Sequence, residues 1–225
     1  MFHTCSDAAK SAAPFNYNVM HIKENAVGAT IAGGSLGRWF EQLCRIRHQT
    51  LADVVTHSSA ALAPRSLPSQ GGVYVFWWTG DQSVLLSTDC SRDLILVGPK
   101  GRPVHLTIDD EWLGISTGLP VPLYVGKNAD SIASRVGKHL RLKETRTLPL
   151  GGGAAKAKAP TTSCQLRAGI EHLFPACSDS RSLILNNVGL SYVELHGDES
   201  AANRFYLEDL AIGLMRPPLN VDVER

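Results

Sequence analysis

The stretch Leu123-Tyr124-Val125-Gly126-Lys127 decides the fold that we expect for this chain. It has the length and apolar character of a strand, and the residues that follow have the apolar spacing of a helix over about 132–140. Arg135 and His139 are four residues apart and therefore project from the same side of that helix. The stretch thus predicts a strand followed by a helix that carries a cation and an imidazole.

Further elements are predicted on both sides of this stretch from the spacing of apolar residues. Strands are expected at 72–78, 84–87, 94–97, 104–108 and 190–195, and helices at 35–48, 50–62, 163–174 and 200–215. No internal repeat is evident.

The composition is that of a globular protein. With 225 residues, 44% hydrophobic and 19% charged, the chain is long enough for one sizeable domain with a modest appendage. Its five cysteines are scattered and no Cys-x-x-Cys pair occurs, which predicts reduced thiols in a cytoplasmic protein rather than a zinc finger or a disulfide framework. No apolar run approaches the ~20 residues that a membrane span needs, so no membrane partner is expected.

Positive charge is concentrated in one region, although the formal net charge is only +1. Residues 127–146 hold six Lys or Arg against two acids, and a low-complexity basic loop at about 145–162 follows. The loop is either a surface connection or an arm that becomes ordered on a polyanion. We expect contacts with phosphate from Gly126, Lys127, Lys138, Arg141, Lys156, Lys158 and Arg167.

Two groups of acids could take part in chemistry. Asp109, Asp110 and Glu111 are adjacent in a loop and point in different directions, which favours solvation over metal binding. Glu208 lies among apolar residues of the last helix, and a buried carboxylate needs a partner. That partner is either Arg204, four residues earlier, or a metal ion.

The order of these residues resembles the motifs of the GIY-YIG nuclease superfamily. Gly72-Val73-Tyr74 corresponds to the first motif and Tyr124-Val125-Gly126 to the second. The other matches are Arg135 and His139 in the helix, the acid Glu208, and Asn220 after two prolines. The resemblance covers roughly residues 72–220. It implies an α+β fold with a small, mostly antiparallel central sheet flanked by helices, with an extra β insertion and an N-terminal helical segment.

The resemblance also implies an activity and its residues. It implies a stand-alone endonuclease that hydrolyses phosphodiester bonds in double-stranded DNA with Mg²⁺ or Mn²⁺ on Glu208, of restriction or phage-defence type. Tyr74 would act on the attacking water, either as a base or as a relay to His139, and a homodimer would provide a second centre for the second strand. The catalytic residues it implies are Tyr74, Tyr124, Arg135, His139, Glu208 and Asn220.

The chain departs from the family pattern in the fifty positions that separate Tyr74 from Tyr124, a longer gap than usual. We therefore expect an N-terminal lead-in and helical segment at 1–65, and a nuclease-like domain at 71–225 with a β insertion at about 81–119. Two other functions stay open at this point: a catalytically inactive module of the same fold that binds nucleic acid, and a nuclease directed at RNA.

Overall fold

The computed structural model describes residues 35–57, 62–64, 67–97, 102–110, 112–113, 119–140 and 165–220. The elements in chain order are α2 (Ser35–Leu43), the 3-10 turn η1 (Leu51–Val54), β1 (Val55–His57), β2 (Leu62–Pro64), β3 (Gly72–Trp78), α3 (Gln82–Leu86), β4 (Asp93–Val97), β5 (Pro103–Thr107), β6 (Val121–Asn128), α4 (Ile132–Leu140), α5 (Gln165–Leu173), α6 (Ser180–Asn187), β7 (Val188–Glu194), the 3-10 turn η5 (Asp198–Ser200) and α7 (Ala201–Met215).

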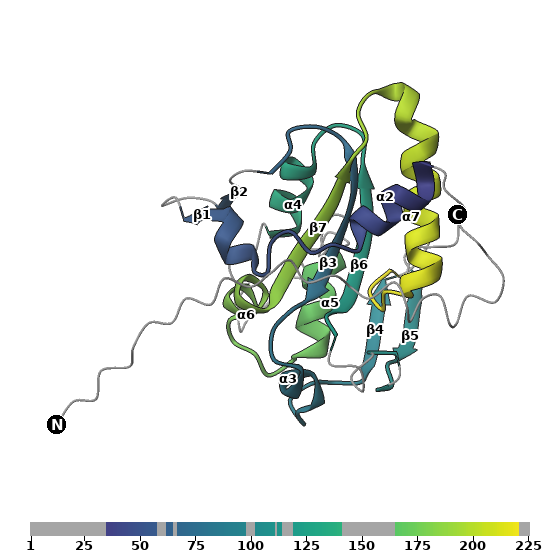
Figure 1. Ribbon diagram of the computed structural model, residues 1–225. Helices are drawn as coiled ribbons and strands as arrows, with labels where there is room; N and C mark the ends of the chain where they lie inside the picture. The colour runs from purple at the N-terminus through teal and green to yellow at the C-terminus, as the bar shows by residue number, and fades with distance from the viewer. Residues whose placement is uncertain are drawn as a thin grey trace, which may run out of the picture.

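Strand β3 is the centre of a three-stranded antiparallel sheet with the order β6-β3-β7 (Figure 1). All seven of its residues are buried, because helices cover both faces of the sheet. Tyr74 pairs with Gly126 on β6 and with Tyr192 on β7. The expected α+β class, with a small antiparallel sheet flanked by helices, is confirmed.

The two faces of the sheet form two separate cores. Tyr74, Phe76 and Trp78 pack with residues of α4, α5 and α6. The alternate residues of the same strand pack with α2 and α7 on the other face. The side on which a residue of the sheet lies therefore decides which helices it can meet.

Two of the expected elements are wrong. Residues 50–57 do not form the expected helix: a 3-10 turn leads into β1, and β1 pairs with β2, while residues 58–61 lie outside the described residues. The β-branched pair Val54 and Val55 suits this extended path. Residues 84–87 were expected as a strand, yet α3 occupies 82–86, because the Asp81 carboxylate accepts a hydrogen bond from the Ser83 N–H at 2.8 Å and caps the helix.

One helix is shorter than the sequence predicts, and one further helix is present that the sequence analysis does not predict. The first helix stops at Leu43 rather than continuing to residue 48, and His48 instead forms a β-bridge with Leu190. Helix α6 was not expected; the Asp179 side chain caps it at the Ser182 N–H, 3.0 Å away. Such caps are short local signals that periodicity alone does not detect.

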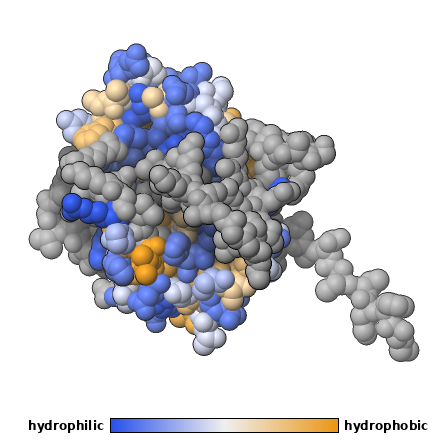
Figure 2. Space-filling model, turned by 180° about the vertical axis from the view of Figure 1, so that it is seen from behind, coloured by the Kyte–Doolittle hydropathy of each residue, from blue (hydrophilic) through white to orange (hydrophobic). Residues whose placement is uncertain are grey.

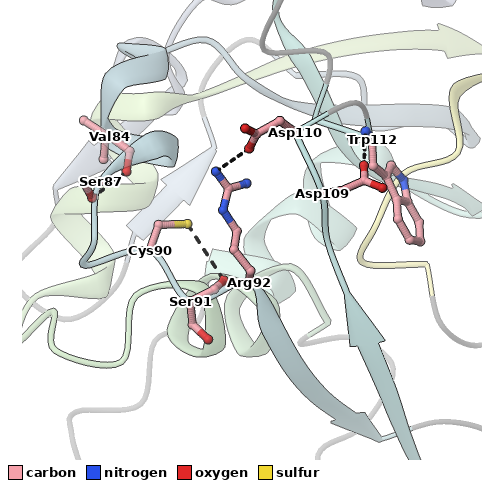
Figure 3. Close-up of polar contacts among 8 residues, drawn as sticks. All are labelled: Val84, Ser87, Cys90, Ser91, Arg92, Asp109, Asp110 and Trp112. Atoms are coloured by element: carbon pink, nitrogen blue, oxygen red, sulfur yellow. Dashed lines mark hydrogen bonds and ion pairs between the residues drawn. The ribbon is translucent and has the colours of Figure 1, made fainter.

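The insertion between β3 and β6 contains the β4–β5 hairpin and the helix α3. Its acids form hydrogen bonds within the insertion, as Figure 3 shows. Arg92 donates to Asp110 at 2.9 Å, and Asp109 accepts from the Trp112 N–H at 2.6 Å. The Trp112 indole donates to the Arg216 carbonyl just after α7. Asp109 and Asp110 thus hold loop structure; Glu111 is outside the described residues.

The N-terminal helical segment shares the core of the sheet. Phe40 and Leu43 of α2 pack in one cluster with β3, β6 and α7. On the face seen in Figure 2, the coloured surface mixes hydrophilic side chains with small apolar spots. Within the part of the chain that the structure describes, no helix has the length and apolarity to cross a membrane.

Candidate active site

Strands β3 and β6 bring the two motif tyrosines together on the face covered by α4. Tyr74 is fully buried, and its ring centroid lies 6.4 Å from that of Tyr124. Opposite Tyr74 in the sheet is Gly126, where a Cβ would lie 2.5 Å from the Tyr74 hydroxyl. A side chain at this position would collide with the phenol, so the glycine of the second motif makes room for the tyrosine of the first.

Helix α4 brings the imidazole to Tyr74. The Asn128 side chain at the end of β6 accepts hydrogen bonds from the N–H groups of Asp130 and Ser131, at 2.6 and 2.8 Å, and so starts the turn into the helix. The apolar stripe of α4 faces the core, and His139 beside it is completely buried. Its Nε2 lies 3.0 Å from the Tyr74 hydroxyl oxygen.

Arg135, one turn before His139, lies half-buried against both phenols. The charge of its guanidinium and its side-chain interactions with the hydroxyls of Tyr74 and Tyr124 act on the pKa values of these groups. The direction of the Tyr74–His139 hydrogen bond depends on the tautomer of the imidazole. Nε of Arg135 and Nδ1 of His139 are buried and have no hydrogen-bond partner among the described residues.

The protonation states follow from this burial. Burial raises the pKa of Tyr74, with the neighbouring Tyr124 adding to the effect and Arg135 opposing it, so the phenol is neutral at pH 7. Burial and then the charge of Arg135 lower the pKa of His139 to about 3. Burial lowers the pKa of Arg135, but the two phenols outweigh this and hold it above its usual value. The cluster is therefore a charged guanidinium between neutral acid–base groups.

Glu208 lies on the other side of β6. Its carboxylate is buried on α7 and forms an ion pair with Lys127. Lys127 pairs across the sheet with Val73, and Val73 packs in the core beneath α7, which places the ion pair on the α7 face. The negative charge of Glu208 still contributes to the raised pKa of Tyr74, as the smallest of its causes. The structure therefore brings Tyr74, Tyr124, Arg135 and His139 together on the α4 face and places Glu208 on the α7 face.

The alternative partner of Glu208 has a different contact. The Arg204 guanidinium donates to the carbonyls of Leu195 and Gly197, at 2.8 and 2.7 Å, and fastens the loop before α7. Sequence reasoning anticipated that Glu208 needs a cation but not that the cation comes from strand β6.

Asn220 binds the backbone of β6. Its Oδ1 accepts from the Val125 N–H at 2.8 Å and its Nδ2 donates to the Val125 carbonyl at 2.7 Å. The Leu219 N–H also donates to the Leu123 carbonyl, at 3.1 Å. Both ends of the amide are therefore used on the strand that carries Tyr124 and Gly126, and Asn220 is a positioning residue for that strand.

The residues expected to contact phosphate are placed as follows. Lys138 is exposed in the last turn of α4. Arg167 on α5 pairs with Glu171 at 2.9 Å. Arg141, Lys156 and Lys158, like the basic loop, lie outside the described residues.

Sequence reasoning missed two rings beside the cluster. The Phe76 ring meets the His139 ring edge to face, with centroids 5.2 Å apart. Tyr192 is the β7 neighbour of Tyr74. The period-two spacing from Tyr74 to Phe76 was a signal for the first; for the second, nothing in the sequence indicates which strand pairs with β3.

The donor chemistry around Glu208 fits a divalent ion. Carboxylate oxygen is a ligand that Mg²⁺ and Mn²⁺ accept, and Mg²⁺ commonly takes one or two protein carboxylates and completes its shell with water and phosphate oxygens. The ammonium of Lys127 already demonstrates that a cation can sit on this carboxylate. Among the described residues no group of three or more His, Cys, Asp or Glu gathers, and Glu208 is a candidate ligand with a single carboxylate.

Comparison of the chain with protein-family models, with curated proteins and with solved structures gave no match.

Proposed function

We propose that the chain is a divalent-metal-dependent endonuclease of the GIY-YIG type that hydrolyses phosphodiester bonds in DNA. The observation that carries this proposal is the buried cluster in which the Tyr74 hydroxyl lies 3.0 Å from Nε2 of His139 and the charge of Arg135 acts on both phenols. A guanidinium offers two donors to phosphate oxygens, and a phenol linked to an imidazole offers a path for a proton. Phosphodiester hydrolysis needs both.

The proton path favours a relay over a standing phenolate. Because the pKa of Tyr74 is raised, its phenol cannot serve as an ionised base at pH 7. In this proposal, DNA binding has to bring the attacking water to the buried Tyr74 oxygen, and Nδ1 of His139 carries the hydrogen of the imidazole. The Tyr74 oxygen then takes a proton from the water while its own hydrogen passes to Nε2 of His139. The water oxygen then bonds to phosphorus and the bond to the leaving oxygen breaks.

A bound phosphate would prepare His139 for this step. The pKa of His139 is lowered by burial and by the charge of Arg135. A phosphate on the Arg135 guanidinium would offset that charge and raise the pKa of His139 again. The imidazole would therefore accept a proton only when substrate is in place. A metal ion on Glu208 would supply positive charge for the phosphate and the leaving oxygen.

We place the activity in the cytoplasm, as a restriction or phage-defence enzyme acting on double-stranded DNA. Cys44, Cys90 and Cys177 are free thiols, which supports a reducing compartment. A second copy of the chain would supply the centre for the second strand.

Glu208→Gln tests the metal-binding role. The change removes the charge that would bind the ion while keeping the size of the side chain. We expect nicking of supercoiled plasmid in Mg²⁺ to fall by at least ~100-fold, with DNA binding retained in a gel-shift assay. The matched control is Asp209→Asn, which removes an exposed acid from the adjacent position of α7. Full activity of Glu208→Gln would remove the carboxylate from the proposal.

A second candidate is a nucleic-acid-binding module without turnover. It is favoured by the complete burial of Tyr74 and His139 and by the ammonium on Glu208. Incubation of wild-type protein with plasmid and with single-stranded RNA, each with Mg²⁺ and with EDTA, separates the candidates. Binding of DNA without any cleavage favours the module, and cleavage of RNA alone changes the substrate class.

A further inference from the structure

The Lys127–Glu208 ion pair is the most tightly enclosed pair of opposite charges in the described part of the chain. The side chains are 23% and 9% exposed, and Nζ contacts Oε2 directly. Lys127 extends from the end of β6 and Glu208 from the middle of α7, so the pair joins the strand that carries Tyr124 and Gly126 to the helix on the opposite face. The partners are 81 positions apart in the chain.

The ammonium occupies the place that a metal ion would need. Two cations at contact distance from one carboxylate oxygen repel each other strongly in a partly buried site. Binding of a divalent ion to Glu208 therefore requires Lys127 to leave.

Lys127 has a second contact on α7 while it is paired with Glu208. Its Nζ is already 5.2 Å from the centroid of the Phe205 ring on α7, within the range of a cation–π contact. It also follows Gly126 directly, and Gly126 lies against the Tyr74 hydroxyl. A phosphate bound at this end of β6 would compete with Glu208 for the ammonium.

We propose that Lys127 is a latch, meaning a side chain that closes the metal-binding carboxylate until substrate phosphate draws it away. This inference rests on the proposed function. It makes substrate and metal binding cooperative: phosphate takes the ammonium, the carboxylate is released for the ion, and by linkage the ion tightens the binding of the substrate. In the absence of DNA, Lys127 therefore prevents a metal ion from binding to Glu208.

The test measures Mn²⁺ affinity by titration with electron paramagnetic resonance, without any cleavage step. All variants carry Tyr74→Phe, so that added duplex stays intact. Without DNA, Lys127→Met is expected to bind Mn²⁺ about tenfold more tightly than the protein that keeps Lys127. Lys127→Arg keeps the charge and should remain weak, and Lys138→Met is the control for loss of an exposed lysine charge.

Addition of a short duplex completes the test. On addition of the duplex, the affinity for Mn²⁺ should rise in the protein that keeps Lys127 and stay level in Lys127→Met. The Glu208→Gln variant measures the Mn²⁺ held by DNA alone, and this signal is subtracted. If Lys127→Met fails to fold, as judged by circular dichroism, Lys127→Gln provides the same comparison.

Equal Mn²⁺ affinity with and without the Lys127 charge would overturn the latch. If wild-type protein nicks plasmid in Mg²⁺ while the affinities are equal, only the latch fails. If the affinities differ as expected but no nucleic acid is cut, the latch stands and the proposed nuclease function fails. If no protein that keeps Glu208 binds Mn²⁺, with or without the Lys127 charge, both the latch and the proposed metal site fail.

Discussion

The Tyr74 phenol has no contact with solvent, its oxygen lies 3.0 Å from Nε2 of His139, and the charge of Arg135 opposes the rise of its pKa. Each neighbour has a definite state because burial sets it: the phenol and the imidazole are neutral, and the guanidinium is charged. A strand tyrosine is often only a core residue with a satisfied hydroxyl. The neutral imidazole and the charged guanidinium beside one phenol distinguish Tyr74 from that ordinary case.

Gly126→Ala tests the close approach between the motifs. The new Cβ would lie 2.5 Å from the Tyr74 hydroxyl, which is below any ordinary contact, and the phenol would have to move. We expect a loss of about 1–3 kcal/mol in the free energy of unfolding, measured by urea denaturation. Gly213→Ala on α7 is the control, because its Cβ would meet nothing within 4 Å. There a small gain is expected, since alanine favours helix. Equal stability of the two variants would contradict the packing described.

His139 makes stability depend on pH. Its pKa in the folded protein is lowered to about 3, below the ~6.5 of an unfolded chain. As pH falls below ~6.5, the unfolded state binds the proton first, so stability present above that pH is lost by up to ~1.4 kcal/mol per pH unit towards pH 3. Wild-type protein should therefore lose more stability between pH 7 and 5 than His139→Gln, by roughly 1–2 kcal/mol. His105→Gln, at an exposed position, is the control. Parallel pH curves for wild type and His139→Gln would show that the imidazole is not held neutral.

At the scale of elements, strand β6 does most to organise the site. It carries Tyr124 and Gly126 towards α4 and Lys127 towards α7, and the Asn220 amide fixes its outer edge. The alternation of side chains along one strand therefore divides the site between two faces.

Asn220→Ala should weaken this strand. The change removes two hydrogen bonds to Val125 and is expected to cost about 1–3 kcal/mol of stability. As a positioning residue, Asn220 should affect kcat more than KM. Asn220→Asp keeps the acceptor for the Val125 N–H but loses the donor, so it should lie between wild type and alanine. An Asn220→Ala protein with wild-type stability and a raised KM alone would point to substrate contact instead.

Some elements of the fold could be predicted from the sequence, and others could not. Strand 72–78 could be predicted to the residue, because its apolar run is bounded by glycine and by Thr79-Gly80. The helix expected at 50–62 and the strand expected at 84–87 were wrong, because the apolar pattern is short in both segments. β-branched residues favour the extended strand β1 in the first, and the cap at Asp81 starts a helix in the second. Arg135 and His139 could be placed together from their spacing on one helix. The Lys127–Glu208 pair could not, because it joins residues 81 positions apart through tertiary packing.

At the scale of the whole molecule, the central strand β3 is buried on both sides and separates two cores. The polar cluster lies on one face of the neighbouring strand β6, and the Lys127–Glu208 ion pair lies on the other. The α2 segment completes the α7 face, and the insertion is tied to the end of α7 through Trp112. The N-terminal segment and the insertion are thus both packed or bonded to the α7 side of the fold.

The most direct test of the central claim is the single-turnover rate of DNA cleavage in Mg²⁺ for wild type, Tyr74→Phe and Tyr206→Phe. Tyr206 is 59% exposed on α7 and serves as the control for loss of a phenolic hydroxyl. We predict measurable cleavage by wild type and by Tyr206→Phe, and a rate at least ~100-fold lower for Tyr74→Phe with DNA binding intact. Cleavage by Tyr74→Phe at the wild-type rate would contradict the account.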